Sequence, residues 1–170
     1  MIKVAQGVDF PEIPIDKKYR SAVTGLLKRI LTIYQGLVER FGQDGLDFIK
    51  EVSQRYGTEI AELGKKRVKL NDPKSVGLYL ARVFEMINCQ GEITEFSEDK
   101  VVIRLFGCPY PFDDPEICKA HTTMEEALVK GLGPNLSYNI TKSIPRGDSY
   151  CEHVILSLSR SKLFRTHSGQ

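Results

Sequence analysis

Residues 106–156 read FGCPYPFDDPEICKAHTTMEEALVKGLGPNLSYNITKSIPRGDSYCEHVIL. The pattern changes along this stretch from a proline-rich crossing segment to helix signals and then to strand and turn signals. Pro115 suits the first turn of a helix, because its missing N–H has no helical partner there. We therefore predict a helix over 114–131, followed by strands over 137–144 and 150–159 that form a hairpin.

A second hairpin and several helices are predicted upstream of this stretch. Residues 92–96 and 100–106 have strand character and flank a turn signal at 97–99. Farther upstream, apolar residues recur at the three- and four-residue spacings of amphipathic helices. The predicted helices run from Asp16 to Gly42, from there through Leu63, and from Pro73 to about Cys89.

The predicted fold class is α+β, with N-terminal helices followed by an antiparallel sheet in the order β-hairpin, helix, β-hairpin, and with that helix packed over the sheet. A chain of 170 residues has the size of one domain. We expect a single domain over 1–170, with a helical part at 16–89, the sheet and its helix at 90–160 and a polar tail at 161–170.

Composition narrows the classes of partner. The 24 basic and 22 acidic residues nearly balance, so no overall field favours nucleic acid. The N-terminal residues lack the apolar core of a secretory signal, and no stretch has the length and apolar composition of a membrane span. We expect a cytoplasmic protein with no nucleic-acid partner and no membrane partner.

Cysteine and histidine residues gather in the second half of the chain. Cys118 and His121 project from one face of the predicted helix, Cys108 lies just before it, and Cys151 opens the last strand. In a reducing compartment such cysteines are free or bound to metal. A helix laid over the sheet could bring the four together as a tetrahedral site for zinc, with iron as the alternative. His153 shares a strand face with Cys151 and competes with His121 for the ligand role.

A second interpretation of these cysteines stays open. Free cysteine is among the residues most often buried and packs as a small hydrophobic side chain. Cys89 stands alone in the sequence, so we predict that it belongs to the core.

The same stretch carries a resemblance to known families. The matching elements are Cys-Pro-Tyr at 108–110, Pro-Glu-Ile-Cys at 115–118, and Gly147 followed by Cys151 within a strand hairpin. They resemble the L-2-amino-thiazoline-4-carboxylic acid hydrolase-like family. The hairpin is also similar to that of vinyl reductase-type ligand-binding domains, which are found in bacteriochlorophyll enzymes and in sensors of aromatic compounds. The chain departs from both patterns at Glu152 and His153, where Asp and Phe are expected.

The resemblance implies two classes of function. The first is a hydrolase that opens the carbon–nitrogen bond of a cyclic amino-thiazoline carboxylate. A metal-bound hydroxide would attack the ring, His153 and Glu152 would transfer protons, and Arg104 or Arg146 would bind the substrate carboxylate. Such a site needs an open coordination position, so only three of the four metal-binding candidates could be ligands. The alternative is a non-catalytic sensor module for a small molecule, with the N-terminal helices forming a homodimer.

Overall fold

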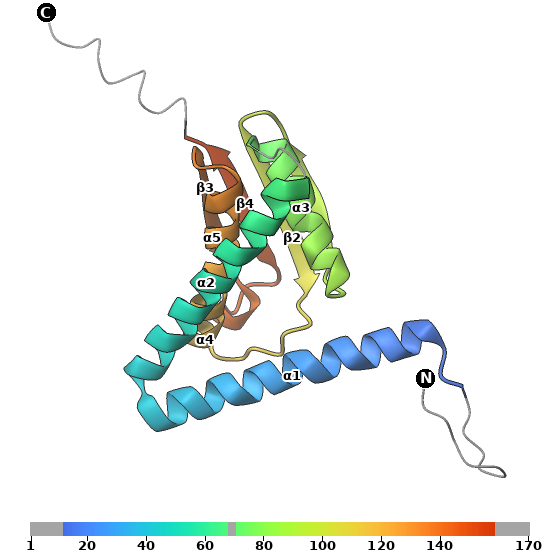
Figure 1. Ribbon diagram of the computed structural model, residues 1–170, viewed down its shortest axis with the longest axis vertical. Coiled ribbons are helices and arrows are strands. Elements are labelled where there is room, and N and C mark those ends of the chain that lie inside the picture. The colour runs from blue at the N-terminus through green and yellow to red at the C-terminus, as the bar shows by residue number, and fades with distance from the viewer. Residues whose placement is uncertain (1–11, 68–70, 159–170) are drawn as a thin grey trace, which may run out of the picture.

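A computed structural model describes residues 12–67 and 71–158, which form helices followed by an antiparallel sheet (Figure 1). In chain order the elements are α1 (Ile15–Phe41), α2 (Gln43–Arg67), α3 (Pro73–Met86), β1 (Gln90–Phe96), β2 (Lys100–Gly107), α4 (Pro115–His121), α5 (Thr123–Leu132), β3 (Leu136–Lys142), the 3₁₀ turn η1 (Ile144–Arg146) and β4 (Cys151–Ser157). The predicted α+β class is confirmed. The predicted tail, 161–170, lies outside the described residues.

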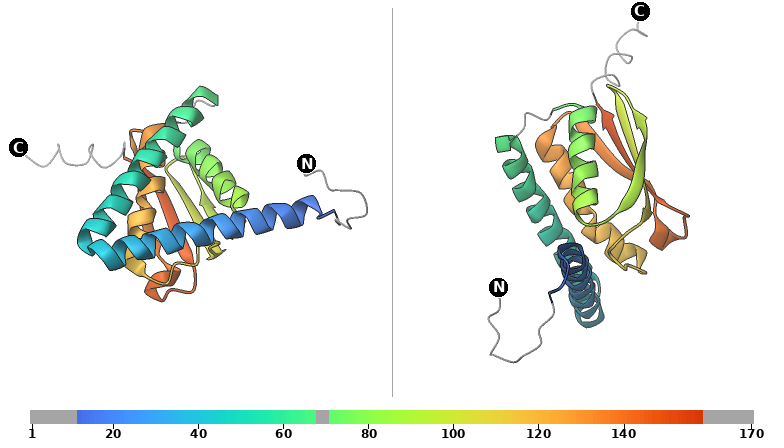
Figure 2. Two further views of the ribbon diagram at one scale, coloured as in Figure 1. Left: turned by 60° about the horizontal axis from the view of Figure 1, so that its bottom comes forward. Right: turned by 90° about the vertical axis from the view of Figure 1, so that its right-hand side faces the viewer.

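The sheet has the strand order β1-β2-β4-β3, and every neighbouring pair is antiparallel. Helices cover one face of this sheet, as Figure 2 shows from the side. α3 and α5 contact the sheet, and α2 packs against α5 on the outside. The helical layer on the sheet therefore contains more than the single helix predicted from 114–131, because α3 packs on the strands beside α5.

The helix predicted over 114–131 is divided into α4 and α5 at Thr122. The Thr122 hydroxyl donates a hydrogen bond to the Lys119 carbonyl oxygen at 3.1 Å, and the Thr123 hydroxyl donates one to the Ala120 carbonyl oxygen at 2.8 Å. Threonine hydroxyls at these spacings compete with the backbone for helix carbonyls. The two adjacent threonines give a local reason for the break.

The core lies between the sheet and the helices. Alternate residues of each strand face the helices, as the two-residue period of a strand requires. On β2 and β4 these include Val101, Ile103, Cys151 and Ile155, all of which are buried. Leu80 of α3 is inaccessible to solvent and packs on them. Burying a side chain of this size contributes about 1.5–3 kcal/mol.

Glycine lets α2 and α5 approach closely. A Cβ atom on Gly57 would lie 2.1 Å from the Met124 carbonyl oxygen, and one on Gly131 would lie 2.4 Å from the Ala61 Cβ. Both distances are far below van der Waals contact. This close packing lets α2 contribute Ser53 to the group of buried side chains around Glu125 that is described below.

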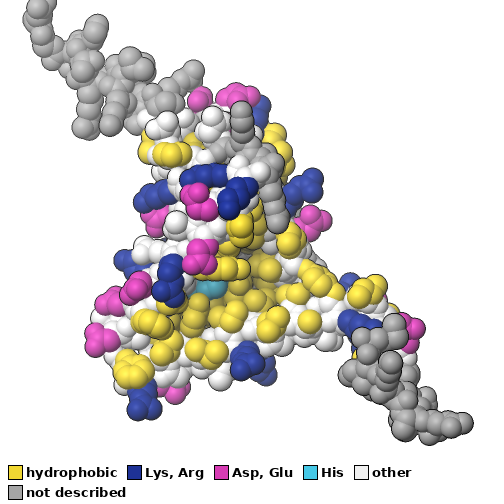
Figure 3. All heavy atoms as spheres, in the orientation of Figure 1, with side chains coloured by type: hydrophobic (Ala, Val, Ile, Leu, Met, Phe, Trp, Pro, Cys, Tyr) yellow, Lys and Arg dark blue, Asp and Glu magenta, His cyan; other side chains and the backbone are white. Residues whose placement is uncertain are grey.

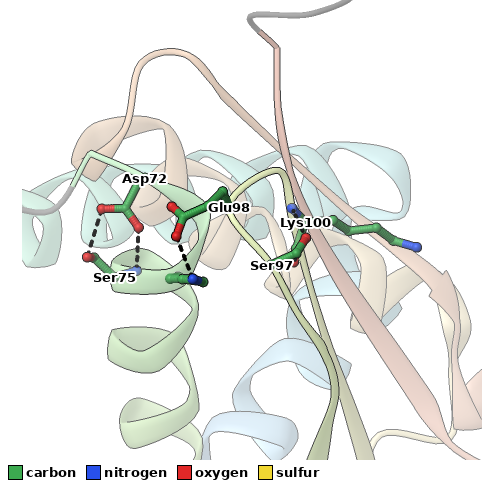
Figure 4. A network of polar contacts seen from close by, with 6 residues as sticks. Asp72, Ser75, Ser97, Glu98 and Lys100 are labelled. Carbon is green, nitrogen blue, oxygen red and sulfur yellow. Dashed lines mark hydrogen bonds and ion pairs between the residues drawn. The ribbon is translucent and has the colours of Figure 1, made fainter.

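Polar contacts join the start of α3 to the tip of the β1–β2 hairpin (Figure 4). Asp72 caps α3 by accepting the Ser75 N–H at 2.9 Å, and this hydrogen bond lowers the pKa of the Asp72 carboxyl. Such a cap stabilises a helix by about 1 kcal/mol. Lys74, in the first turn, forms an ion pair with Glu98 at the hairpin tip.

Among the described residues, no helix combines the length and apolar composition that crossing a membrane requires.

Candidate functional site

Glu125 is a carboxyl group buried in the interior of the protein. It lies on the inward face of α5 and is 6% exposed. Its Oε2 atom has no hydrogen-bond partner among the described residues. Burial penalises the carboxylate and raises the pKa of Glu125 to about 8, so the carboxyl keeps its proton at neutral pH.

Four further groups whose pKa is raised mainly by burial lie within electrostatic reach of this carboxyl. They are Tyr34 of α1, Tyr110 of the β2–α4 segment, Cys118 of α4 and Tyr138 of β3. Burial is the main cause of the raised pKa of each group, and the negative charge of an ionised Glu125 raises it further. Segments from four parts of the chain therefore converge on one buried acid.

His121 lies in a cage of aromatic rings, two of which, Tyr34 and Tyr110, also lie within electrostatic reach of this acid. The centroid of its ring is 4.4 Å from that of Tyr110, 5.1 Å from that of Phe112 and 5.8 Å from that of Tyr34. The Tyr34 hydroxyl is 3.4 Å from Nδ1, whereas Nε2 has no partner among the described residues. Burial lowers the pKa of His121 to about 4, so the imidazole is neutral at pH 7.

We call this group the Glu125 site and define it as Tyr34, Ser53, Tyr110, Phe112, His121 and Glu125. Ser53 of α2 belongs to it because its side chain is hydrogen-bonded to Tyr34. Within the described part of the chain, His121 and Glu125 each carry a buried polar atom without a partner. An unpaired buried polar group costs about 1–3 kcal/mol. Two such atoms in one cluster are therefore an unusual feature of the interior.

A surface pocket adjoins this site. It has a volume of about 560 Å³, within the range of small-molecule sites, and lies between the start of α2, the α4–α5 pair and β3. Its lining includes Leu46, Ala120, Ile140, Cys118, Tyr138 and Ser143, with charged side chains such as Lys50, Lys119 and Arg146 around them. Cys118 and Tyr138 belong both to this lining and to the groups that the Glu125 charge reaches. We call this cavity the α4–β3 pocket.

The predicted cysteine ligands approach one another, but His121 does not join them. Charge on Cys108 raises the pKa of both Cys118 and Cys151, after the larger effect of burial, so the three thiols are neighbours. Cys151 Sγ accepts a hydrogen bond from the Ile144 N–H at 3.4 Å. His121 turns instead into the aromatic cage. Over residues 12–67 and 71–158, no three His, Cys, Asp or Glu side chains are arranged to hold a metal ion.

Glu152 and His153 lie on opposite faces of the sheet. The Arg104 side chain donates a hydrogen bond to Glu152 at 2.9 Å, and Thr141 donates a second at 2.8 Å. His153 faces the core, where Nδ1 is 2.5 Å from the Tyr138 hydroxyl and the ring centroid is 4.8 Å from that of Phe84. Burial lowers the pKa of His153 to about 4. The period of the strand keeps the two predicted proton-transfer groups apart.

The two predicted substrate-binding arginines are also separated. Arg104 lies on β2 and pairs with Glu152, whereas Arg146 lies on η1 and lines the α4–β3 pocket. Arg146 donates a hydrogen bond to the Ile140 carbonyl oxygen at 3.5 Å. Of the two, Arg146 shares a cavity with Cys118.

Sequence reasoning missed Glu125 and Tyr34. One signal for Glu125 was present, because it stands three, four and seven positions before Leu128, Val129 and Leu132 and so shares their apolar helix face. A carboxylate on such a face is rarely buried without a reason. Tyr34 has the spacing of an ordinary member of an apolar helix stripe, and no local pattern indicates that its hydroxyl would meet His121.

Comparisons with known proteins support the fold and leave the family open. No family model matches the chain, and no curated protein matches it either. Among solved structures, the chain is similar to the phenol-responsive sensory domain of the transcription activator PoxR with phenol, with a TM-score of 0.57 and 10% identity over 82% of this chain and 76% of that one. It is also similar to a trafficking protein particle complex subunit 3 from Naegleria fowleri covalently bound to palmitic acid. The TM-score is 0.56 and the identity 12%, over 83% of this chain and 96% of that one.

These similarities agree with the resemblance to small ligand-binding α+β domains at the level of the fold. Neither of them supports the resemblance to a thiazoline hydrolase.

Proposed function

We propose that the protein is a non-catalytic module that binds a small organic molecule in the α4–β3 pocket. The observation that carries this proposal is a cavity of about 560 Å³ whose wall includes Cys118 and Tyr138, both of which lie within electrostatic reach of the buried carboxyl of Glu125. Cavities that combine apolar walls with a few polar groups of altered pKa are the default binding sites of a fold. The separation of Glu152 from His153 weighs against the hydrolase alternative.

The lining indicates the chemistry of the ligand. Leu46, Ala120 and Ile140 offer apolar contact for the body of a molecule. Two of the acidic lining residues already pair with lysines, Glu116 with Lys119 and Glu126 with Lys130. Lys50 and Arg146 add positive charge, which Asp47 offsets in part. This balance favours a ligand with an apolar body and one acidic group.

The ligands of the two similar structures serve as probes of this chemistry. Phenol and palmitate each join an apolar body to a weakly acidic group, and they differ greatly in length. We expect saturable binding of at least one of them in calorimetry, with NMR shift changes centred on the pocket. Arg146→Gln should weaken binding of an ionised ligand by roughly tenfold, which corresponds to about 1.4 kcal/mol.

A matched pair of tryptophan variants separates the pocket from the rest of β3. Ile140→Trp places a larger side chain on the strand face that lines the pocket, whereas Ser137→Trp, three residues away on the same strand, lies on the other face and outside the lining. The first should abolish binding and the second should leave it unchanged. Failure of both probes to bind, or binding that Ile140→Trp does not affect, contradicts the proposal.

We also infer that the protein forms a homodimer through α1. This helix extends beyond the body at its N-terminal end in two views (Figures 1 and 2), and hydrophobic side chains gather over the face formed by α1, α2 and α3 (Figure 3). Tyr19, Leu26 and Ile33 recur every seven residues on one side of α1 and are all exposed. A seven-residue apolar repeat is the pattern of a helix that pairs with another helix. A second copy of the chain carries the same stripe.

A further inference from the structure

Two thiols meet where the β1–β2 hairpin joins the rest of the molecule. Gln90 of β1 pairs with Gly107 of β2 in the antiparallel ladder. Cys89 precedes Gln90 and Cys108 follows Gly107, so one further step along the ladder places the two cysteines opposite each other. The predicted metal site includes Cys108 but not Cys89, and the two cysteines are far apart in the sequence.

The backbone holds Cys89 in this position. Asn88, at the end of α3, adopts a left-handed conformation with φ of 63°, which asparagine tolerates better than most residues. The chain turns there, and the Cys89 N–H donates a hydrogen bond to the Phe84 carbonyl oxygen at 2.9 Å. The Cys89 side chain packs against the core, as predicted, but it is only partly buried.

The two side chains interact directly. The Cys89 thiol is hydrogen-bonded to Cys108, and this contact is the main cause of the lowered pKa of Cys108, to which the Tyr110 N–H also contributes. The same contact raises the pKa of Cys89. Cys108 is exposed to solvent, so a reagent can reach its sulfur. A thiol with a lowered pKa that is also exposed is the better nucleophile of the pair.

We propose that Cys89 and Cys108 form a redox-active dithiol that is converted to an intramolecular disulfide by exchange with a low-molecular-weight disulfide. The Cys108 thiolate attacks one sulfur of the reagent, whose S–S bond breaks and releases one small thiolate. The Cys89 thiolate then attacks the Cys108 sulfur of the mixed disulfide and releases the second. The two protons of the protein thiols pass to the released thiolates, so the protein loses two electrons and the reagent gains them.

The geometry requires only a small movement. Directly opposed residues in an antiparallel pair have Cβ atoms about 4.5–5.5 Å apart. A disulfide needs about 3.5–4.5 Å. The shift of roughly 1 Å falls at the end of the ladder, next to a register shift between Gln90 and Gly91, where Cys108 begins the connection to α4 rather than the middle of a strand.

The other two cysteines are poorer partners for the exchange. Cys151 is buried and its sulfur accepts the Ile144 N–H. Burial raises the pKa of Cys118 to about 12, so little thiolate is present at neutral pH. This inference does not depend on a ligand in the α4–β3 pocket.

The test treats the reduced full chain with oxidised glutathione, alkylates the remaining thiols and maps the peptides by mass spectrometry. We expect a linked pair of peptides that contain Cys89 and Cys108, with Cys118 and Cys151 alkylated. Cys89→Ser should stop the reaction at the mixed disulfide, with one glutathione on Cys108. Cys118→Ser is the matched control and should still form the Cys89–Cys108 bond.

Three results would overturn the proposal: alkylation of all four cysteines after treatment, a disulfide that involves Cys118 or Cys151, or a Cys89→Ser variant that carries no glutathione on Cys108. Circular dichroism of each variant checks that it is folded. A Cys108→Ser variant provides a second test, because it should leave Cys89 unmodified by the reagent.

Discussion

The buried carboxyl of Glu125 makes stability depend on pH. In the unfolded chain it ionises near its ordinary pKa of 4.5, whereas in the folded chain it keeps its proton until about pH 8. The unfolded state therefore binds fewer protons within this window, and the free energy of unfolding falls as pH rises, by up to about 1.4 kcal/mol per pH unit. His121 and His153 act in the opposite direction, because their pKa values fall from 6.5 to about 4. Between those values stability decreases as pH falls.

Glu125→Gln tests the alkaline side of this dependence. We expect the native chain to be most stable near pH 6.5, where the histidine effect ends and the Glu125 effect continues. In the variant, the loss of stability between pH 6.5 and 8 should largely disappear in urea unfolding. Glu126→Gln is the control, since Glu126 is only partly buried and pairs with Lys130 at 2.9 Å. An unchanged slope in Glu125→Gln would show that Glu125 does not hold its proton.

The packing of α2 against α5 predicts opposite effects for two glycine substitutions. Gly57→Ala places a Cβ atom against the Met124 carbonyl oxygen and should destabilise the fold by about 1–3 kcal/mol. Gly36→Ala, within α1, meets nothing within 4 Å and should stabilise the helix by about 0.5–1 kcal/mol. Both changes are measured by chemical denaturation. If both substitutions changed the free energy of unfolding by the same amount, α2 and α5 would have to be farther apart than in this structure.

The exposed stripe on α1 predicts the state of the whole molecule in solution. Leu26 and Ile33 are 62% and 52% exposed, and two helices that pair along this stripe would bury them both. We expect a dimer in sedimentation velocity. Leu26→Glu combined with Ile33→Glu should shift it to monomer, because the charges would face the partner helix.

The control for the dimer uses the other side of the same helix. Ser21→Glu combined with Thr32→Glu adds the same charge at exposed positions away from the stripe. This variant should stay dimeric. A monomer at all protein concentrations for the native chain, or the same dissociation in both double variants, would contradict pairing through the stripe.

Local signals predicted the elements more accurately than their assembly. The amphipathic spacing of the helices, the turn signal at 97–99 and the helix start at Pro115 all act between near neighbours, and each helix and strand that they predicted is present. The break at Thr122 was missed because helix periodicity continues across it. The helix α3 was predicted, but its packing on the sheet was not, because it depends on long-range contacts with the strands.

Short-range chemistry in the sequence determined the α+β class, the order of helices and strands along the chain and the shared strand face of Cys151 and His153 on β4. Only the tertiary structure decided that Cys89 meets Cys108, that His121 turns away from the thiols, and that Glu125 is buried. The physical reason is distance along the chain. Periodicity and turn residues act over a few positions, whereas these contacts join segments whose meeting depends on how the helices pack on the sheet.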